Sequence, residues 1–145
     1  MFDQALPHIQ QSVKMNPYSA NVNDLGVVYQ HKGDIQKAKK YYTQAINLKP
    51  ALLSPYINLA TILVLYDDPK EAIPLIKNQL IKSHSDVSRF WVLLAVAEYK
   101  SHNQDAALQA TQTAYNLSAD PQTAYVYDII SNRKPIESID NKLLE

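Results

Sequence analysis

The side chains that could carry out acid–base or metal chemistry in this sequence are few and scattered. The histidines are His8, His31, His84 and His102. None has a second histidine at the i, i+4 spacing that places two metal ligands on one face of a helix. Glu98 and Asp105 are the best candidates for a general acid and a general base, but their surroundings indicate no buried pocket that would tune them for catalysis. We therefore predict solvated histidines and carboxylates, no metal site and no enzymatic activity.

The composition excludes several other kinds of chemistry. The chain has 145 residues with no cysteine, two glycines, and 14 basic against 14 acidic side chains. Without cysteine there is no disulfide, thiolate zinc site or iron–sulfur cluster, and two glycines are too few for phosphate-binding glycine-rich loops. The balanced charge gives no broad attraction to nucleic acid. We therefore expect no cofactor and no nucleic-acid partner.

The sequence also lacks the patterns of a membrane span and of a signal peptide. Its longest uncharged stretch, residues 50–66, includes two prolines and is shorter than the roughly 20 apolar residues of a spanning helix. The first ten residues do not combine a basic segment with an apolar one. We expect a soluble chain without membrane insertion, located in the cytoplasm or, as the alternative, in the periplasm.

A repeat of 34 to 35 residues is the strongest pattern in the chain. Four positions at i, i+3, i+4 and i+7 place apolar and small side chains on one stripe of a helix. The stripes are Val22, Leu25, Gly26 and Tyr29, then Tyr56, Leu59, Ala60 and Leu63, and finally Trp91, Leu94 and Ala95. A further small residue recurs in step, as Ala38, Ala72 and Ala107. The pattern predicts two helices in each repeat.

Helix-breaking segments at residues 32–34, 67–69 and 102–105 divide each repeat into a helical hairpin. The predicted hairpins span residues 19–52, 53–86 and 88–121. Residues 1–17 repeat the pattern of a second helix whose first helix is missing, and residues 122–145 are expected to form capping helices. The last of these would carry Ile136, Ile139 and Leu143 on one face. No flexible linker divides the chain, so we expect a single domain over residues 1–145.

These motifs resemble the tetratricopeptide repeat (TPR). The first repeat carries the signature as Val22, Leu25, Gly26 and Tyr29, followed by Ala38, Tyr42, Ala45 and Pro50. The resemblance implies an all-α fold, an α-solenoid of antiparallel helical hairpins that form a right-handed superhelix. Gly26, Ala60 and Ala95 would lie where the two helices of each hairpin cross, so a larger side chain there would overpack the crossing.

The second and third repeats depart from the motif at several positions. Pro74 lies inside the second helix of the second repeat, where it should kink the helix and remove one hydrogen bond. Glu98 replaces a motif tyrosine and Thr111 a later aromatic residue. The third repeat is therefore predicted to be a degenerate copy of the motif.

The resemblance also implies a concave surface, lined by the first helix of each hairpin, that binds a peptide or a partner protein. The expected binding residues are Asn23, Val27, Gln30, His31, Ile57, Asn58, Thr61, Val64, Arg89, Val92, Val96 and Tyr99. An alternative stays open, because neighbouring first helices need apolar contacts and the last helix could fold back on them. The aliphatic residues of the set would then be core.

The expected function is that of a protein-interaction module of a larger, bacterial protein, with an unidentified partner. A start in mid-repeat and the ending Leu144–Glu145, a dipeptide that expression vectors often leave before a tag, suggest a segment taken from that protein. One alternative is a passive scaffold or spacer attached to a catalytic or membrane domain, as in TPR-bearing glycosyltransferases. The other is a homo-oligomerisation domain.

Overall fold

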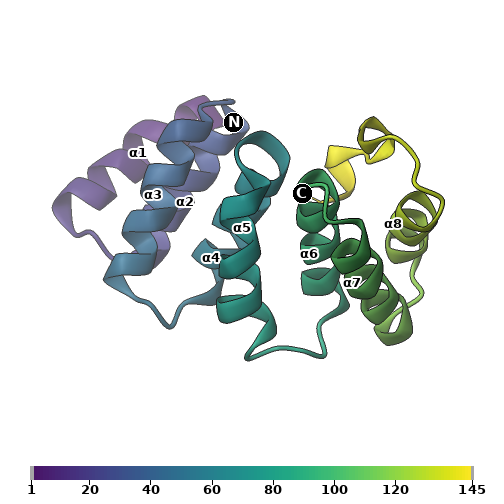
Figure 1. Ribbon diagram of the computed structural model, residues 1–145. Helices are drawn as coiled ribbons and strands as arrows, with labels where there is room; N and C mark the ends of the chain where they lie inside the picture. The colour runs from purple at the N-terminus through teal and green to yellow at the C-terminus, as the bar shows by residue number, and fades with distance from the viewer. Residues whose placement is uncertain (1, 145) are drawn as a thin grey trace. The chain divides into compact units, whose positions relative to one another are not determined.

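The computed structural model describes residues 2–144, apart from the side chains of Phe2, Asp3 and Leu143, and these residues form helices and no strand. The all-α prediction is therefore confirmed (Figure 1). The α-helices are α1 (Phe2–Met15), α2 (Ser19–His31), α3 (Ile35–Leu48), α4 (Leu53–Tyr66), α5 (Pro69–Leu75), α6 (Ser88–Lys100), α7 (Gln104–Leu117) and α8 (Pro121–Ser131). The π-helix η1 (Ile76–Ile81) follows α5, and the 3₁₀ turns η2 (Ile136–Ser138) and η3 (Asn141–Leu143) follow α8. None of the described helices is both long and apolar enough to span a membrane.

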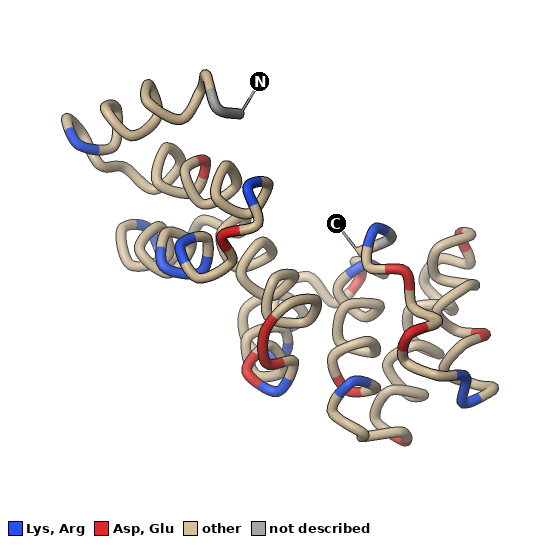
Figure 2. Tube along the Cα trace, turned by 90° about the horizontal axis from the view of Figure 1, so that it is seen from above, with Lys and Arg blue, Asp and Glu red and all other residues tan. Residues whose placement is uncertain are grey.

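The chain divides into two compact units, residues 1–62 and residues 63–145, with the boundary inside α4. In unit 1, α2 packs against α1 and α3. In unit 2, α6 packs against α7 and α8, and α7 also packs against α8. Figure 2 marks the charged residues along the trace: residues 1–62 carry six basic and three acidic residues, and residues 63–145 carry eight basic and eleven acidic ones.

Most residues of the predicted stripes are buried, whereas Trp91 of the third stripe is only half-buried. Leu25 and Gly26 are buried in unit 1, and Leu94 and Ala95 are buried at the corresponding places in unit 2. A Cβ atom added to Gly26 would lie 2.6 Å from Cε1 of Tyr42, whose side chain is fully buried. Glycine is therefore required in α2 because the ring of Tyr42, from α3, lies directly against its backbone.

A serine at the start of α2 and of α6 links each of these helices to the second helix of its repeat. Ser19 Oγ donates a hydrogen bond to the carbonyl of Ala45 at 2.9 Å, and Ser88 Oγ donates to the carbonyl of Ala114 at 3.0 Å. Both serines and both alanines are 69 residues apart, which is two repeats. The repeat therefore extends to polar contacts that the hydrophobic pattern does not reveal.

The same backbone turn ends α2, α6 and α8. Each turn contains a residue with positive φ, namely Gly33 at 77°, His102 at 64° and Arg133 at 49°. In each turn the next residue donates its N–H to a carbonyl five residues earlier, as Asp34 does to Tyr29 and Lys134 does to Ile129. This left-handed arrangement satisfies carbonyls at the helix end and reverses the chain.

The prediction of a kink at Pro74 matches a change of helix type. The α-helix α5 ends one residue after Pro74, and the chain continues as the π-helix η1, in which Lys82 N–H donates to the carbonyl of Lys77. Proline cannot donate the N–H that the α-helical pattern requires, so the hydrogen-bond register changes near it.

The end of the chain differs from the prediction of one helix carrying Ile136, Ile139 and Leu143. The structure has two short 3₁₀ turns, and Ile139 between them is extended, with φ −81° and ψ 110°. Ile139 is nevertheless buried, while the side chain of Leu143 and the whole of Glu145 lie outside the described residues. The segment thus buries apolar side chains without forming a helix.

Asp120 caps the N-terminus of α8 and should make unit 2 sensitive to acid. Its carboxylate accepts hydrogen bonds from the N–H and Oγ1 of Thr123 and from Oγ of Ser118. These hydrogen bonds, chiefly the one from the Thr123 N–H, hold the pKa of Asp120 below its ordinary 3.8. The stabilisation is therefore complete above the ordinary pKa and disappears as pH falls through the lower, folded-state pKa.

We expect Asp120→Ala to lower the free energy of unfolding by about 1 kcal/mol at neutral pH. Urea titrations followed by circular dichroism at pH 7 and at pH 2.5 test this expectation. Asp120→Asn is the control, because asparagine still caps a helix but does not titrate. If Asp120→Ala lowers the free energy of unfolding equally at both pH values, the ionised carboxylate is not the source of the stabilisation.

Candidate functional site

Glu98 is not the solvated carboxylate that the sequence suggested. Its residue exposure is 3%, and its Oε1 accepts a hydrogen bond from Lys77 Nζ at 2.8 Å. Its Oε2 accepts from Asn103 Nδ2 at 2.7 Å. With both oxygens bound by its neighbours, the carboxylate links η1 to the turn after α6. Asp105, the proposed catalytic partner, is exposed.

The histidines do not form a metal centre within the part of the chain that the structure describes, where no group of three or more potential ligands comes together. His8, His31 and His102 are exposed, as predicted. His84 is half-buried, and its ring lies edge-on to that of Phe90 with centroids 6.2 Å apart. Its surroundings are therefore partly apolar, in contrast to those of the other three.

In unit 1 we use the name α2–α4 patch for the predicted binding residues of α2 and α4 that keep exposed surface: Val27, Gln30, His31, Ile57 and Asn58. Asn58 Nδ2 donates to Asn23 Oδ1 at 3.0 Å, so the two helices are joined at this surface. Val27, Ile57 and Asn58 are half-buried and His31 is exposed. This patch therefore offers both apolar and polar groups to a ligand.

Two other predicted residues of these helices, Asn23 and Thr61, are buried, and the side chain of Gln30 is bound by a residue of α3. Asn23 is 8% exposed and Thr61 is 6% exposed. Thr61 Oγ1 bonds to the carbonyl of Ile57 in its own helix, at 2.8 Å. Gln30 accepts a hydrogen bond from the Tyr42 hydroxyl at 2.7 Å. These side chains position the patch and leave little surface of Asn23 or Thr61 for a ligand.

In unit 2 the predicted residues of α6 form one stripe, which we call the α6 face: Arg89, Val92, Val96 and Tyr99. Val92 is 2% exposed, Val96 is fully buried, and Val64 of α4 is 1% exposed. These three valines are core in this structure, as the packing alternative anticipated. Tyr99 is also buried, whereas Arg89 is exposed.

Residues 134–144, here called the returning segment, lie on the α6 face. Tyr99 Oη donates to the carbonyl of Lys134 at 2.5 Å, and Arg89 Nη2 donates to the carbonyl of Leu144 at 3.3 Å. Two of the predicted binding residues therefore donate hydrogen bonds to main-chain carbonyls of their own chain. The packing alternative in the sequence analysis allowed the end of the chain to fold back on the first helices, but it did not identify these hydrogen bonds.

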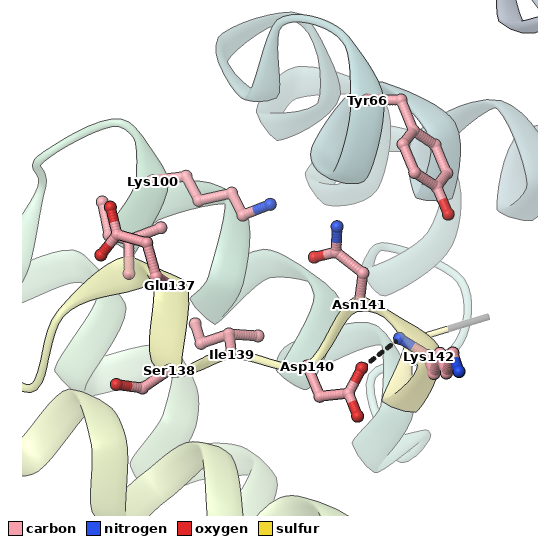
Figure 3. A pocket seen from close by; sticks show the side chains of 9 residues that line it. Tyr66, Lys100, Glu137, Ser138, Ile139, Asp140, Asn141 and Lys142 are labelled. Atoms are coloured by element: carbon pink, nitrogen blue, oxygen red, sulfur yellow. Dashed lines mark hydrogen bonds between the residues drawn. The ribbon is translucent and has the colours of Figure 1, made fainter.

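A cleft of about 730 Å³ lies between the end of α4, the end of α6 and the returning segment (Figure 3). Tyr66 and Lys100 line it on the helical side, and residues 136–142 line the other side. Lys100 Nζ donates to the carbonyl of Val64 at 3.1 Å, and burial lowers the pKa of this lysine. The segment's turn is closed locally, because the Asp140 carboxylate accepts from the N–H of Lys142 (Figure 3).

Comparison with known families and structures agrees with this architecture. The family model of the tetratricopeptide repeat matches residues 22–52, which include most of α2 and all of α3. A comparison with curated proteins finds no match.

Similar solved structures include several of the protein MamA. The MamA RS-1 ArsTM double mutant has a TM-score of 0.84 at 16% identity, covering 99% of this chain and 79% of that one. MamA 41-end from Desulfovibrio magneticus RS-1 has a TM-score of 0.84 at 16% identity, covering 91% and 75%. MamA MSR-1 C2 has a TM-score of 0.77 at 15% identity, covering 99% and 84%. At this level of identity the likeness is one of fold.

Proposed function

Because this chain is a tetratricopeptide-repeat protein, we propose that it is a protein-interaction module whose first helices bind a segment of a partner protein. The returning segment on the α6 face is the observation that carries the proposal. Arg89 and Tyr99 there donate hydrogen bonds to main-chain carbonyls, which every peptide presents. The face of a first helix in this fold is thus chemically suited to a peptide.

The partner segment binds to the α2–α4 patch. Val27 and Ile57 supply apolar contacts for aliphatic side chains of the partner, while His31 and Asn58 supply polar contacts for its backbone. The hydrogen bond between Asn58 and Asn23 links the two helices in the absence of a partner.

Lysine substitutions on the patch test this proposal. We expect Val27→Lys combined with Ile57→Lys to weaken partner binding at least about tenfold, since charged groups replace both apolar contacts. The partner is first captured from a lysate of the source organism with the unaltered chain and identified by mass spectrometry. Its affinity for each variant is then measured with the purified partner by isothermal titration calorimetry.

Gln36→Lys is the matched control, because Gln36 is exposed on α3, outside the patch. Circular dichroism of all variants must show equal helix content. If the patch variant and the control bind the partner with equal affinity, the patch is not the binding surface. If no partner is captured and the chain instead shows a concentration-dependent mass, the module serves self-association.

A further inference from the structure

The returning segment follows the α6 face from one end to the other. Its first residue, Lys134, is bound by Tyr99 in the last turn of α6, and Leu144 is bound by Arg89 in the first turn. The segment therefore runs antiparallel to α6. Val92 and Val96 lie on the same stripe between the two bound ends, since all four residues follow helical spacing. Both valines are buried.

Most hydrogen bonds from the helices to this segment are accepted by its main-chain carbonyls and not by its side chains. Besides Arg89 and Tyr99, Tyr125 of α8 donates its hydroxyl hydrogen to a main-chain carbonyl, that of Ser138. Contacts to carbonyls do not depend on the amino-acid sequence of the segment. Any other peptide that placed its carbonyls at these points could accept the same hydrogen bonds.

Three side chains distinguish this segment from any other peptide: Lys134, whose Nζ donates to the carboxylate of Asp128 in α8, and two aliphatic ones. Ile139 is 5% exposed and Leu144 is 4% exposed, while Asp140 and Lys142 between them are exposed. The segment has no regular helix to stabilise it, since η2 and η3 are single 3₁₀ turns of three residues. Such a segment can detach without unfolding the helices beneath it.

We propose that the returning segment is an intramolecular ligand of the α6 face, and that a partner segment of like chemistry displaces it. The displacing segment carries two aliphatic residues separated by polar residues and presents its carbonyls to Arg89 and Tyr99. The chain then has a covered binding surface in unit 2, besides the α2–α4 patch of unit 1. This inference rests on the proposed function, because it assumes that first helices bind peptides.

Thiol labelling tests whether the segment detaches, since the chain has no cysteine of its own. Ile139→Cys places the single thiol on the segment, and Ile130→Cys places it in the core of α8, where Ile130 is fully buried. We expect the thiol of Ile139→Cys to react at least about 100-fold faster than that of Ile130→Cys, because local detachment costs less free energy than unfolding of the unit. Equal rates at the two positions would overturn the proposal.

A synthetic peptide with the sequence of residues 134–144 tests whether the face accepts a ligand from outside. Added in excess to the full chain, it should further increase the labelling rate of Ile139→Cys several-fold, because it binds the uncovered face and keeps the segment detached. The control peptide carries Ile139→Asp and Leu144→Asp. An equal effect of both peptides, or no effect of either, would show that the face does not recognise the aliphatic residues, and the proposal would fail.

Two further observations distinguish this inference from self-association and from the proposed function of the α2–α4 patch. If the labelling rate of Ile139→Cys rises with the concentration of the chain alone, the ligand is the segment of a second copy, and the partner proposal is overturned. The lysine variants of the α2–α4 patch leave the α6 face unchanged, so the proposed function can fail or succeed separately from this inference.

Discussion

Replacing Gly26 by leucine is expected to lower the free energy of unfolding of unit 1 by about 3 kcal/mol. The Cβ atom alone would lie 2.6 and 2.7 Å from two carbons of the Tyr42 ring. The ring has no room to move away, because it is fully buried and its hydroxyl is bound to Gln30 at 2.7 Å. The cost therefore comes from forcing apart α2 and α3.

Urea denaturation followed by circular dichroism measures this effect. Ala20→Leu is the control, since Ala20 is exposed on the same helix and leucine favours helix formation there. The double variant Gly26→Leu/Tyr42→Ala should lose less stability than the sum of the two single variants, because removal of the ring makes room for the leucine. Equal midpoints for Gly26→Leu and Ala20→Leu would show that this helix crossing is not tight.

The second large effect is expected for Lys77→Met, which should destabilise unit 2 by about 2 kcal/mol. The buried carboxylate of Glu98 would lose the ammonium group 2.8 Å away and keep only the amide of Asn103. Because the Lys77 side chain itself is 50% exposed, solvent offsets part of the loss.

The variants Lys82→Met and Lys77→Met/Glu98→Met complete the test by urea denaturation. Lys82 is exposed next to η1, so its replacement should have little effect. The double variant should recover stability relative to Lys77→Met, since an apolar side chain suits the buried position better than an uncompensated charge. A double variant less stable than Lys77→Met would instead show that the carboxylate stabilises the unit through Asn103 alone.

The helices could be predicted from the sequence because the repeat is local and periodic. Stripes such as Val22–Tyr29, the small residue Gly26 and the breaks between helices all lie within one repeat, where helical spacing determines which side chains meet. The burial of Glu98 could also have been inferred, since it is two repeats after Tyr29 and occupies the same inward position. Its partner Lys77 could not, because their contact depends on how two helices of different repeats pack.

The binding surface was predicted less completely for a similar reason. Helical spacing predicts that Arg89, Val92, Val96 and Tyr99 share one stripe of α6, but it predicts neither the path of residues 134–144 nor whether this stripe meets a ligand. That path is determined by contacts such as Arg89 with Leu144, which are 55 residues apart. Helical spacing carries no information about them. The α2–α4 patch stays a prediction for the binding of a partner.

The same left-handed turn ends α2, α6 and α8, so the turn itself does not determine whether another helix follows. The residues after the turn determine this. After the first turn, Asp34 accepts a hydrogen bond from the N–H of Lys37 and starts α3. After the turn at Arg133, Lys134 precedes Pro135, and proline favours extended backbone in the residue before it. One kind of turn is thus followed by a new helix after Gly33 and by extended backbone at Pro135 after Arg133.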